Sequence, residues 1–320
     1  MKILITGVHG FVGSNLVHAL SAEHEIYGLD IIAPEKEGVV KTFGWDVLSE
    51  ELGMKNDELP EVDAIIHLAG KAHDTKNQAQ ADVYFKVNTD LTKKIYDYFL
   101  HSSVRKFIFF SSVKAAADRV EGDFVDETVV PKPKGPYGES KIAAERYILE
   151  NEKMRVKNGQ EVYILRPCMI HGPGNKGNLN LLYNVVSKGS PWPLGAFENR
   201  RTFMSIDNLC FVIKGLLTQH VESGIYHVND DEAVSTNELI EIICEALGKK
   251  PHIWHINRGL MEGVARVGDV LHLPLNSERL RKLTENYISS NVKIKKALGI
   301  TELPVKAKDG LYKTIKSFSK

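Results

Sequence analysis

Short apolar runs alternate with helix-like stretches through the first half of the chain. The apolar runs, which suit buried strands, cover residues 3–5, 24–29, 63–70, 106–112 and 161–166, the last stopped by Pro167. Apolar residues with helical spacing lie between them and predict amphipathic helices at 11–20, 83–101 and 138–151. Strands that alternate with helices and short connections predict an α/β fold with a doubly wound parallel sheet.

The pattern changes after residue 170. Residues 171–178 form a loop by their glycine and proline content, and residues 224–229 resemble a late strand of the same sheet. Ser235 followed by Glu238 predicts a capped helix over 235–247, and a shorter helix is expected around 293–298. We therefore predict a first domain over 1–170 and a smaller α/β lobe over 171–320, with the late strand near 224–229 returning to the first domain.

Three glycines lie directly after the first strand. Gly7 suits a tight turn, Gly10 lets a phosphate approach the backbone, and Gly13 lets the following helix pack closely on the strand. The helix begins at Phe11 and Val12, where free N–H groups and the positive helix end favour an anion. This turn is typical of a pyrophosphate site for a dinucleotide.

Asp30 ends the second strand near the spacing expected of an acid that accepts hydrogen bonds from an adenosine ribose. Its carboxylate would repel a 2′-phosphate, and no arginine follows it closely. NAD is therefore the expected cofactor, and NADP is the less favoured one.

Tyr137 and Lys141 are four residues apart and share one helix face. A free tyrosine titrates near pH 10, and a neighbouring ammonium lowers that pKa. Tyr137 could then exchange a proton with a substrate hydroxyl or carbonyl, while Lys141 binds the nicotinamide ribose. Ser111 and Ser112 end the preceding strand, and we favour Ser112 as the hydroxyl that stabilises charge on the same substrate oxygen.

Together these motifs resemble the extended short-chain dehydrogenase/reductase superfamily, in its NAD-dependent epimerase/dehydratase branch, which acts on nucleotide-activated sugars. The resemblance implies a Rossmann-like sheet with a substrate lobe, and NAD as the cofactor. It covers nearly the whole chain and rests on these segments: 6–13, Asp46-Val47, 67–70, 87–89, Ser111-Ser112, 137–141, 165–167 with 171–173, and 201–207.

The resemblance also assigns roles to residues near the cofactor. Asp46 and Val47 would lie near the adenine, and Leu68 and Ala69 would lie beside the dinucleotide. Asn88 would hold a structural bend in its helix. Relatives pair two helices from each subunit, so we expect a homodimer through residues 89–101 and 138–151.

Departures from the family pattern bear on the reaction. Sugar dehydratases of this branch carry an Asp-Glu pair after the catalytic hydroxyl, whereas Val113 and Lys114 stand here, which argues against dehydration. By resemblance, Arg201 would contact the diphosphate of the sugar nucleotide. Lys114, Asn178 and Arg279 are the other residues that we assign to the substrate.

Segments at 177–178, 189–195 and 199–202 resemble a subgroup that reduces 4-keto-6-deoxy-N-acetylaminosugar nucleotides for surface polysaccharides. We therefore predict reduction at C4 of a UDP-sugar. The alternative is a UDP-glucose 4-epimerase-type enzyme, which uses the same residues. Familiar 4-epimerases carry Val-Tyr-Gly after the serine, whereas residues 115–118 are Ala-Ala-Ala-Asp here. A more remote alternative is a non-catalytic dinucleotide sensor, although such relatives usually lose the tyrosine or the lysine.

Composition narrows the partners. Lys+Arg and Asp+Glu both number 41, so the balance favours neither nucleic acid nor an anionic membrane as the main partner. The histidines lack metal-ligand spacing, and we expect no metal. Cys168, Cys210 and Cys244 suit buried structural thiols in a reducing cytoplasm. The first residues enter a strand directly and no apolar run has membrane-spanning length, so we expect a cytoplasmic protein.

Overall fold

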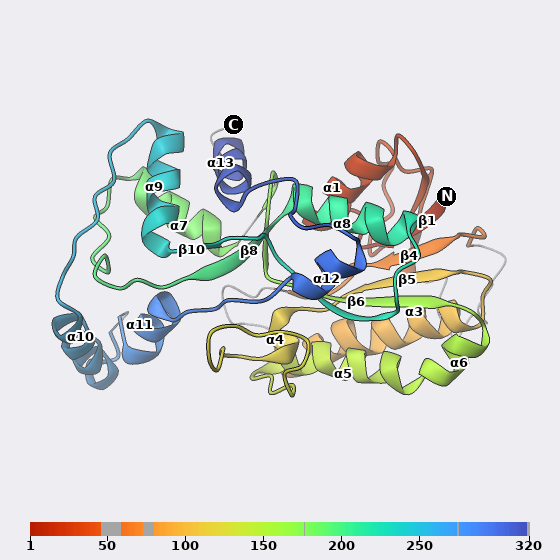
Figure 1. Cartoon of the computed structure of the whole chain (residues 1–320), viewed down its shortest axis with the longest axis horizontal. Coiled ribbons are helices and arrows are strands. Elements are labelled where there is room, and N and C mark those ends of the chain that lie inside the picture. Colours follow the sequence, from red (N-terminus) through yellow and green to blue (C-terminus); the bar gives the residue numbers. More distant parts are fainter. Residues whose placement is uncertain (46–58, 73–79, 176, 274, 319–320) are drawn as a thin grey trace.

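A seven-stranded parallel sheet forms the centre of the computed structural model, which describes residues 1–45, 59–72, 80–175, 177–273 and 275–318 (Figure 1). The strand order is β3-β2-β1-β4-β5-β6-β9. The strands are β1 (Lys2–Thr6), β2 (Glu25–Asp30), β3 (Lys41–Gly44), β4 (Ala64–His67), β5 (Lys106–Phe110), β6 (Glu161–Pro167) and β9 (Gly224–Val228). The predicted α/β fold with a doubly wound, Rossmann-like sheet is confirmed.

Helices cover both faces of this sheet (Figure 1). On one face lie α1 (Phe11–Leu20), α8 (Ile206–Thr218) and α12 (Val292–Ala297), and on the other lie α3 (Leu91–Leu100) and α5 (Pro136–Glu150). Alternate strand residues face the two cores, because successive side chains of a strand point to opposite sides. Ile3 and Ile5 thus pack with α1 and α8, whereas Leu4 packs with α3.

A smaller sheet organises much of the second half of the chain. Its order is β10-β8-β7, with β10 (Ala233–Val234), β8 (Arg201–Ser205) and β7 (Met169–His171). A separate apolar core joins this sheet to α7 (Asn178–Ser187), α9 (Thr236–Leu247) and α13 (Ala307–Ser317). The remaining helices of the described chain are α2 (Ala81–Phe85), η3 (Lys86–Asp90), α4 (Val113–Ala116), α6 (Glu152–Lys157), α10 (Arg258–Leu271) and α11 (Ser277–Thr284).

Several predicted elements differ in detail from the structure. The single helix expected over 83–101 is α2 and α3 joined by the π-helical turn η3. Asn88 lies in that turn, and its side chain exchanges hydrogen bonds with the backbone of Lys71. The strand β6 ends at Pro167 as expected, although the proline itself occupies the last position and pairs in register with Val228. The predicted cap of α9 is confirmed as a reciprocal Ser235–Glu238 capping box.

The boundary at residue 170 stays a prediction. Within 171–320, the strand β9 joins the large sheet, and α8 and α12 contribute side chains to its core. The positions expected for Asp46 and Val47, and the helix-like piece up to Leu52, lie outside the described residues. In the described part of the chain, no helix is both long and apolar enough to span a bilayer.

Candidate active site

The turn between β1 and α1 has the geometry that its glycines predict. Gly7 adopts φ +70°, a conformation that favours glycine. A Cβ atom there would lie 3.1 Å from the backbone nitrogen of Ala69, and one at Gly13 would lie 2.4 Å from the carbonyl oxygen of Gly7. Larger residues would therefore push the turn away from β4 or the helix away from the strand.

The start of α1 fits a pyrophosphate. Its N-cap is Gly10, which offers no side-chain cap, so the first N–H groups of the helix remain available to a ligand. Phe11 and Val12, the first two helical residues, are half-buried. The loop after β7 borders this end of the helix, where the Asn15 amide donates to the carbonyl of Pro173 at 3.2 Å. The residues present fit the dinucleotide that the sequence predicts.

Asp30 lies at the carboxyl end of β2, beside the same turn. Its Oδ2 accepts a hydrogen bond from the His9 backbone at 2.9 Å, and its Oδ1 accepts one from Ile31 at 2.8 Å. Each carboxylate oxygen has a second lone pair, so the fixed side chain can still accept from a ribose hydroxyl.

A buried hydrogen-bond chain fixes the strand ends behind the turn. The Thr6 hydroxyl lies 2.7 Å from His67 Nδ1 and accepts from the backbone of Leu68 and Ala69. His67 Nε2 lies 2.9 Å from the hydroxyl of Thr92. Burial, together with the charge of Lys141, lowers the pKa of His67 to about 3. This histidine is therefore a neutral structural link, and the places of Leu68 and Ala69 beside the dinucleotide stay predictions.

Lys141 is buried beside the strand ends, with 4% of its surface exposed. Its Nζ donates to the carbonyl of Phe110 at 2.8 Å and lies 5.1 Å from the ring centroid of Phe109. Burial lowers the pKa of Lys141 to about 8, while the carboxylate of Glu145 opposes that shift. The charged form of Lys141 is therefore stabilised by the few polar groups around it, the Phe110 carbonyl and the Glu145 carboxylate.

Ser112 and Tyr137 meet at the end of β5. Ser112 is the N-cap of α4, where its hydroxyl accepts from the backbone of Lys114 at 3.2 Å. Burial raises the pKa of Tyr137, and a hydrogen bond with Ser112 partly offsets this rise. The sequence predicted that Lys141 would lower the pKa of Tyr137, but Lys141 does not contribute to its shift. The phenol is therefore protonated at neutral pH.

Two of the predicted substrate residues are close to each other. Burial lowers the pKa of Lys114, and the charge of Arg201 adds to this effect. Lys114 Nζ lies 4.4 Å above the ring of Tyr287 and 3.7 Å from Asp118. Arg201 donates to the backbone carbonyls of Lys282 and Glu285. Lys114 and Arg201 are thus near enough for the charge of Arg201 to act on Lys114.

The other two predicted substrate residues lie elsewhere in the smaller lobe. Asn178 is the first residue of α7, and Arg279 lies in α11; both are exposed. Their roles stay predictions. Cys168 and Cys244 are buried and Cys210 is half-buried, and all three thiols are free. Within the described ranges, no cluster of three acidic, histidine or cysteine side chains is arranged to hold a metal.

Glu145 and Arg166 form a buried ion pair that the sequence analysis did not single out as a pair. Arg166 donates to the carboxylate three times, with distances of 3.0, 3.2 and 2.6 Å. The hydroxyl of Ser111 donates to the same carboxylate. The sequence does place Glu145 one helical turn after Lys141, on the same face of α5, but it gives no sign that Arg166 is the partner.

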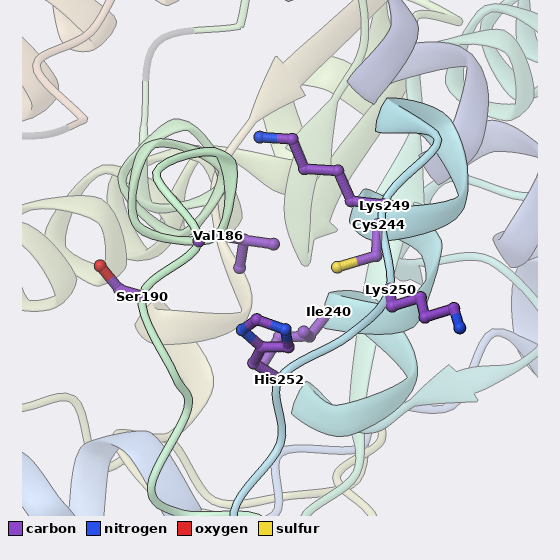
Figure 2. Close-up of a pocket in the computed structure, with 8 residues that line it drawn as sticks. Val186, Ser190, Ile240, Cys244, Lys249, Lys250 and His252 are labelled. Atoms are coloured by element: carbon purple, nitrogen blue, oxygen red, sulfur yellow. The ribbon is translucent and has the colours of Figure 1, made fainter.

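A cavity of about 250 Å³ lies between α7 and α9 in the smaller lobe (Figure 2). Figure 2 shows Val186, Ile240 and Cys244 pointing towards the space between these helices, with Lys249 and Lys250 extending apart. None of the predicted site residues lines it. The candidate site is therefore the edge formed by the carboxyl ends of the large sheet's strands, as in other open α/β sheets.

Comparisons with known proteins identify the family of the chain. Residues 3–229 match the family described as "NAD dependent epimerase/dehydratase family". The chain is 32% identical to a UDP-glucose 4-epimerase of Vibrio cholerae over 259 residues, which cover 78% of this chain and 76% of the relative. It is 26% identical to an N-acetyl-alpha-D-glucosaminyl-diphospho-ditrans,octacis-undecaprenol 4-epimerase of Escherichia coli O157:H7, with 94% and 86% covered.

The fold comparison extends over the whole chain. The crystal structure of UDP-glucuronic acid 4-epimerase from Bacillus cereus in complex with NAD superposes with a TM-score of 0.74 at 20% identity, covering 100% of both chains. At this identity the likeness concerns the fold. With the family match and the glycine turn, the finding is plain: the chain belongs to the NAD-dependent epimerase/dehydratase family and is an enzyme whose cofactor is NAD.

Proposed function

We propose that the protein is a UDP-sugar 4-epimerase. The observation that carries the proposal is the hydrogen bond from Lys141 Nζ to the carbonyl of Phe110 at 2.8 Å, which holds the helix of Tyr137 and Lys141 against the strand end that leads to Ser112. The name of the Vibrio cholerae relative supports the reaction, and the names of both curated relatives support C4 as the reacting carbon.

The chain's own groups suit proton transfer at a C4 oxygen. As the phenolate, which the positive charge of an oxidised nicotinamide nearby would favour, Tyr137 would take the proton of the C4 hydroxyl and return it after the sugar has turned. Ser112 donates to the same oxygen and stabilises the charge that develops on it. Lys141 holds a positive charge beside them. Hydride acceptance and return at C4 is the chemistry that bound NAD supplies.

Lys114 and Arg201 are the proposed anchor for the substrate diphosphate. The charge of Arg201 lowers the pKa of Lys114. An anion between the two cations would relieve this repulsion, and phosphate oxygens suit both side chains. Asn178 and Arg279 are proposed as further sugar-nucleotide contacts. UDP is the proposed nucleotide because the relatives with C4 epimerase names include UDP-sugar enzymes.

A second candidate is reduction of a 4-keto-6-deoxy-N-acetylaminosugar nucleotide. The raised pKa of Tyr137, caused by burial, favours it, because a protonated phenol is the form that donates to a carbonyl oxygen. Val113 and Lys114 also replace the acid pair that dehydration would need. The two candidates differ in whether the cofactor is consumed.

The first experiment incubates the enzyme with NAD and either UDP-glucose or UDP-N-acetylglucosamine. Epimer formation without net NADH, followed by proton NMR, supports the proposal. Stoichiometric NADH oxidation with a UDP-4-keto-6-deoxy sugar, and no epimer from the hexoses, would instead establish the reductase. NAD binding without turnover of any nucleotide sugar would favour the dinucleotide sensor.

Tyr137→Phe tests the site. We expect turnover to fall by roughly 10²–10⁴-fold, the usual contribution of a positioned acid or base, while NAD affinity measured by calorimetry is kept. Phe124→Leu, on an exposed loop, serves as a control that keeps turnover. Full activity of the Tyr137 variant would remove this residue from the chemistry.

A further inference from the structure

The Glu145–Arg166 pair contacts Ser111, the residue before Ser112, and has no part in the chemistry proposed above. Glu145 is fully buried and Arg166 is 1% exposed. Burying two charges carries a large desolvation cost, and well-packed apolar residues of similar volume often stabilise a fold as well or better. Stability alone is therefore a weak explanation for this pair.

The pair is connected to each of the proposed catalytic elements. Ser111, which donates to the Glu145 carboxylate, is the residue directly before Ser112. The backbone of Ser111 also donates to the carbonyl of Leu165, so its place between β5 and β6 is fixed. Glu145 itself lies on α5, two turns after Tyr137 and one turn after Lys141. One carboxylate thus ties the Ser112 segment to the helix that carries the other two groups.

We propose that Glu145, held by Arg166, is a positioning residue that acts through Ser111 to hold the Ser112 hydroxyl against Tyr137. The inference rests on the proposed roles of Ser112 and Tyr137. Fixing a hydroxyl in a productive position matters because displacement by about 1 Å can cost roughly 10²-fold in rate.

The charges around the site agree with this role. The Glu145 carboxylate raises the pKa of Lys141 against the effect of burial, which favours the ammonium form. His67 of β4 and His227 of β9 also face this interior, and burial lowers the pKa of each to about 3. Both are therefore neutral at pH 7, which leaves Glu145 as the anion that acts on Lys141 among the described residues.

The first test removes one hydroxyl with Ser111→Ala. We expect kcat to fall by roughly 10²-fold while KM for the nucleotide sugar stays within about twofold. We also expect the pKa of Tyr137 to rise, because its hydrogen bond with Ser112 lowers that pKa and would be loosened. Fluorine NMR of fluorotyrosine-labelled enzyme, with the resonance assigned by Tyr137→Phe, reads this titration without turnover. Ser103→Ala, an exposed serine before β5, is the matched control.

The second test replaces the pair by Glu145→Leu with Arg166→Met, because apolar residues can substitute for a buried ion pair. We expect a similar loss of kcat, and no further loss when Ser111→Ala is added, since both changes act through one contact. An unchanged kcat and Tyr137 titration in Ser111→Ala would overturn the proposal, and that variant alone decides if the double variant does not fold. A wild-type enzyme that converts no nucleotide sugar would instead refute the proposed function, and the Tyr137 titration would remain readable.

Discussion

Lys141 and His67 are buried side by side, and burial disfavours the charged form of both. The pKa of Lys141 is lowered to about 8 and that of His67 to about 3, so only the lysine carries a charge at neutral pH. The charge of Lys141 contributes to the shift of His67. His67 can therefore serve as a neutral hydrogen-bonded link between Thr6 and Thr92 without competing with the lysine.

The neutral state of His67 predicts a loss of stability in acid. Its pKa is depressed by burial in the folded state, so the unfolded chain binds the extra proton first as pH falls below about 6.5. The free energy of unfolding should drop by about 1.4 kcal/mol per pH unit for this residue down to about pH 3.

His67→Gln keeps a donor and an acceptor but does not titrate. We expect urea denaturation of this variant at pH 7, 6, 5 and 4 to show a shallower acid slope than the wild type. His18→Gln, at an exposed position of α1, should leave the slope unchanged. Equal slopes for His67→Gln and the wild type would contradict the assignment.

Tyr287 joins two elements that belong to different parts of the chain. Its hydroxyl donates to the carbonyls of Val113 and Ala117, at 3.2 and 2.7 Å, in the turn that follows Ser112. Its backbone pairs with residues on either side of Arg201, at Arg200 and Thr202. The residue therefore fixes the spacing between the α4 segment and β8, and with it the two proposed phosphate ligands.

Tyr287→Phe removes those two hydrogen bonds and keeps the ring beneath Lys114. The two carbonyls share one hydroxyl hydrogen, and a buried hydrogen bond contributes about 1 kcal/mol, so we expect KM for the nucleotide sugar to rise by roughly threefold to tenfold. NAD affinity should not change, since the glycine turn is untouched. Steady-state kinetics and calorimetry measure both, and Tyr312→Phe, on α13, is the control. A higher Kd for NAD with an unchanged KM would contradict this role.

Local patterns predicted the elements whose causes are local. The strand and glycine turn at residues 2–13 and the Ser235 cap follow from neighbours in sequence, and both are confirmed. The π-helical turn at Asn88 matches the bend that the family resemblance implied, whereas the local pattern predicted one continuous helix, because the partners Lys71 and Ser140 come from other segments.

The same limit applies to the candidate site. The pairing of Glu145 with Arg166 joins α5 to β6, and neither residue carries a local signal for the other. Tyr137, Lys141 and Ser112 were predicted from their spacing and resemblance. The raised pKa of Tyr137 was not predicted from the sequence, because burial causes it and the whole fold determines burial.

The outer helical face of the large sheet bears on the assembly of the whole molecule. Helices α3 and α5 lie together on the face opposite α1 and α8 (Figure 1). Tyr147 of α5 donates to Asp97 of α3 at 2.6 Å, which holds the two helices in a fixed relation. Leu149 of α5 is 44% exposed. We expect this face to form the two-fold contact of a homodimer.

Leu149→Arg places a charge in that expected contact. Light scattering coupled to size-exclusion chromatography should give a dimer mass for the wild type and a monomer mass for the variant. Val292→Arg, at a 65% exposed position of α12 on the other face, is the matched control and should remain a dimer. A wild-type monomer, or an unaffected variant, would refute the interface.

The return of the chain to its first sheet has a consequence for how such enzymes can diversify. A fragment that ends near residue 170 lacks β9 and α8, although Leu209, Val212 and Leu216 of α8 complete the core around Ile3. Truncation at that point would thus leave an open sheet edge and an exposed apolar surface. A lobe exchanged between paralogues after residue 170 would therefore have to keep the packing of α8 around Ile3 as well as bring new substrate contacts.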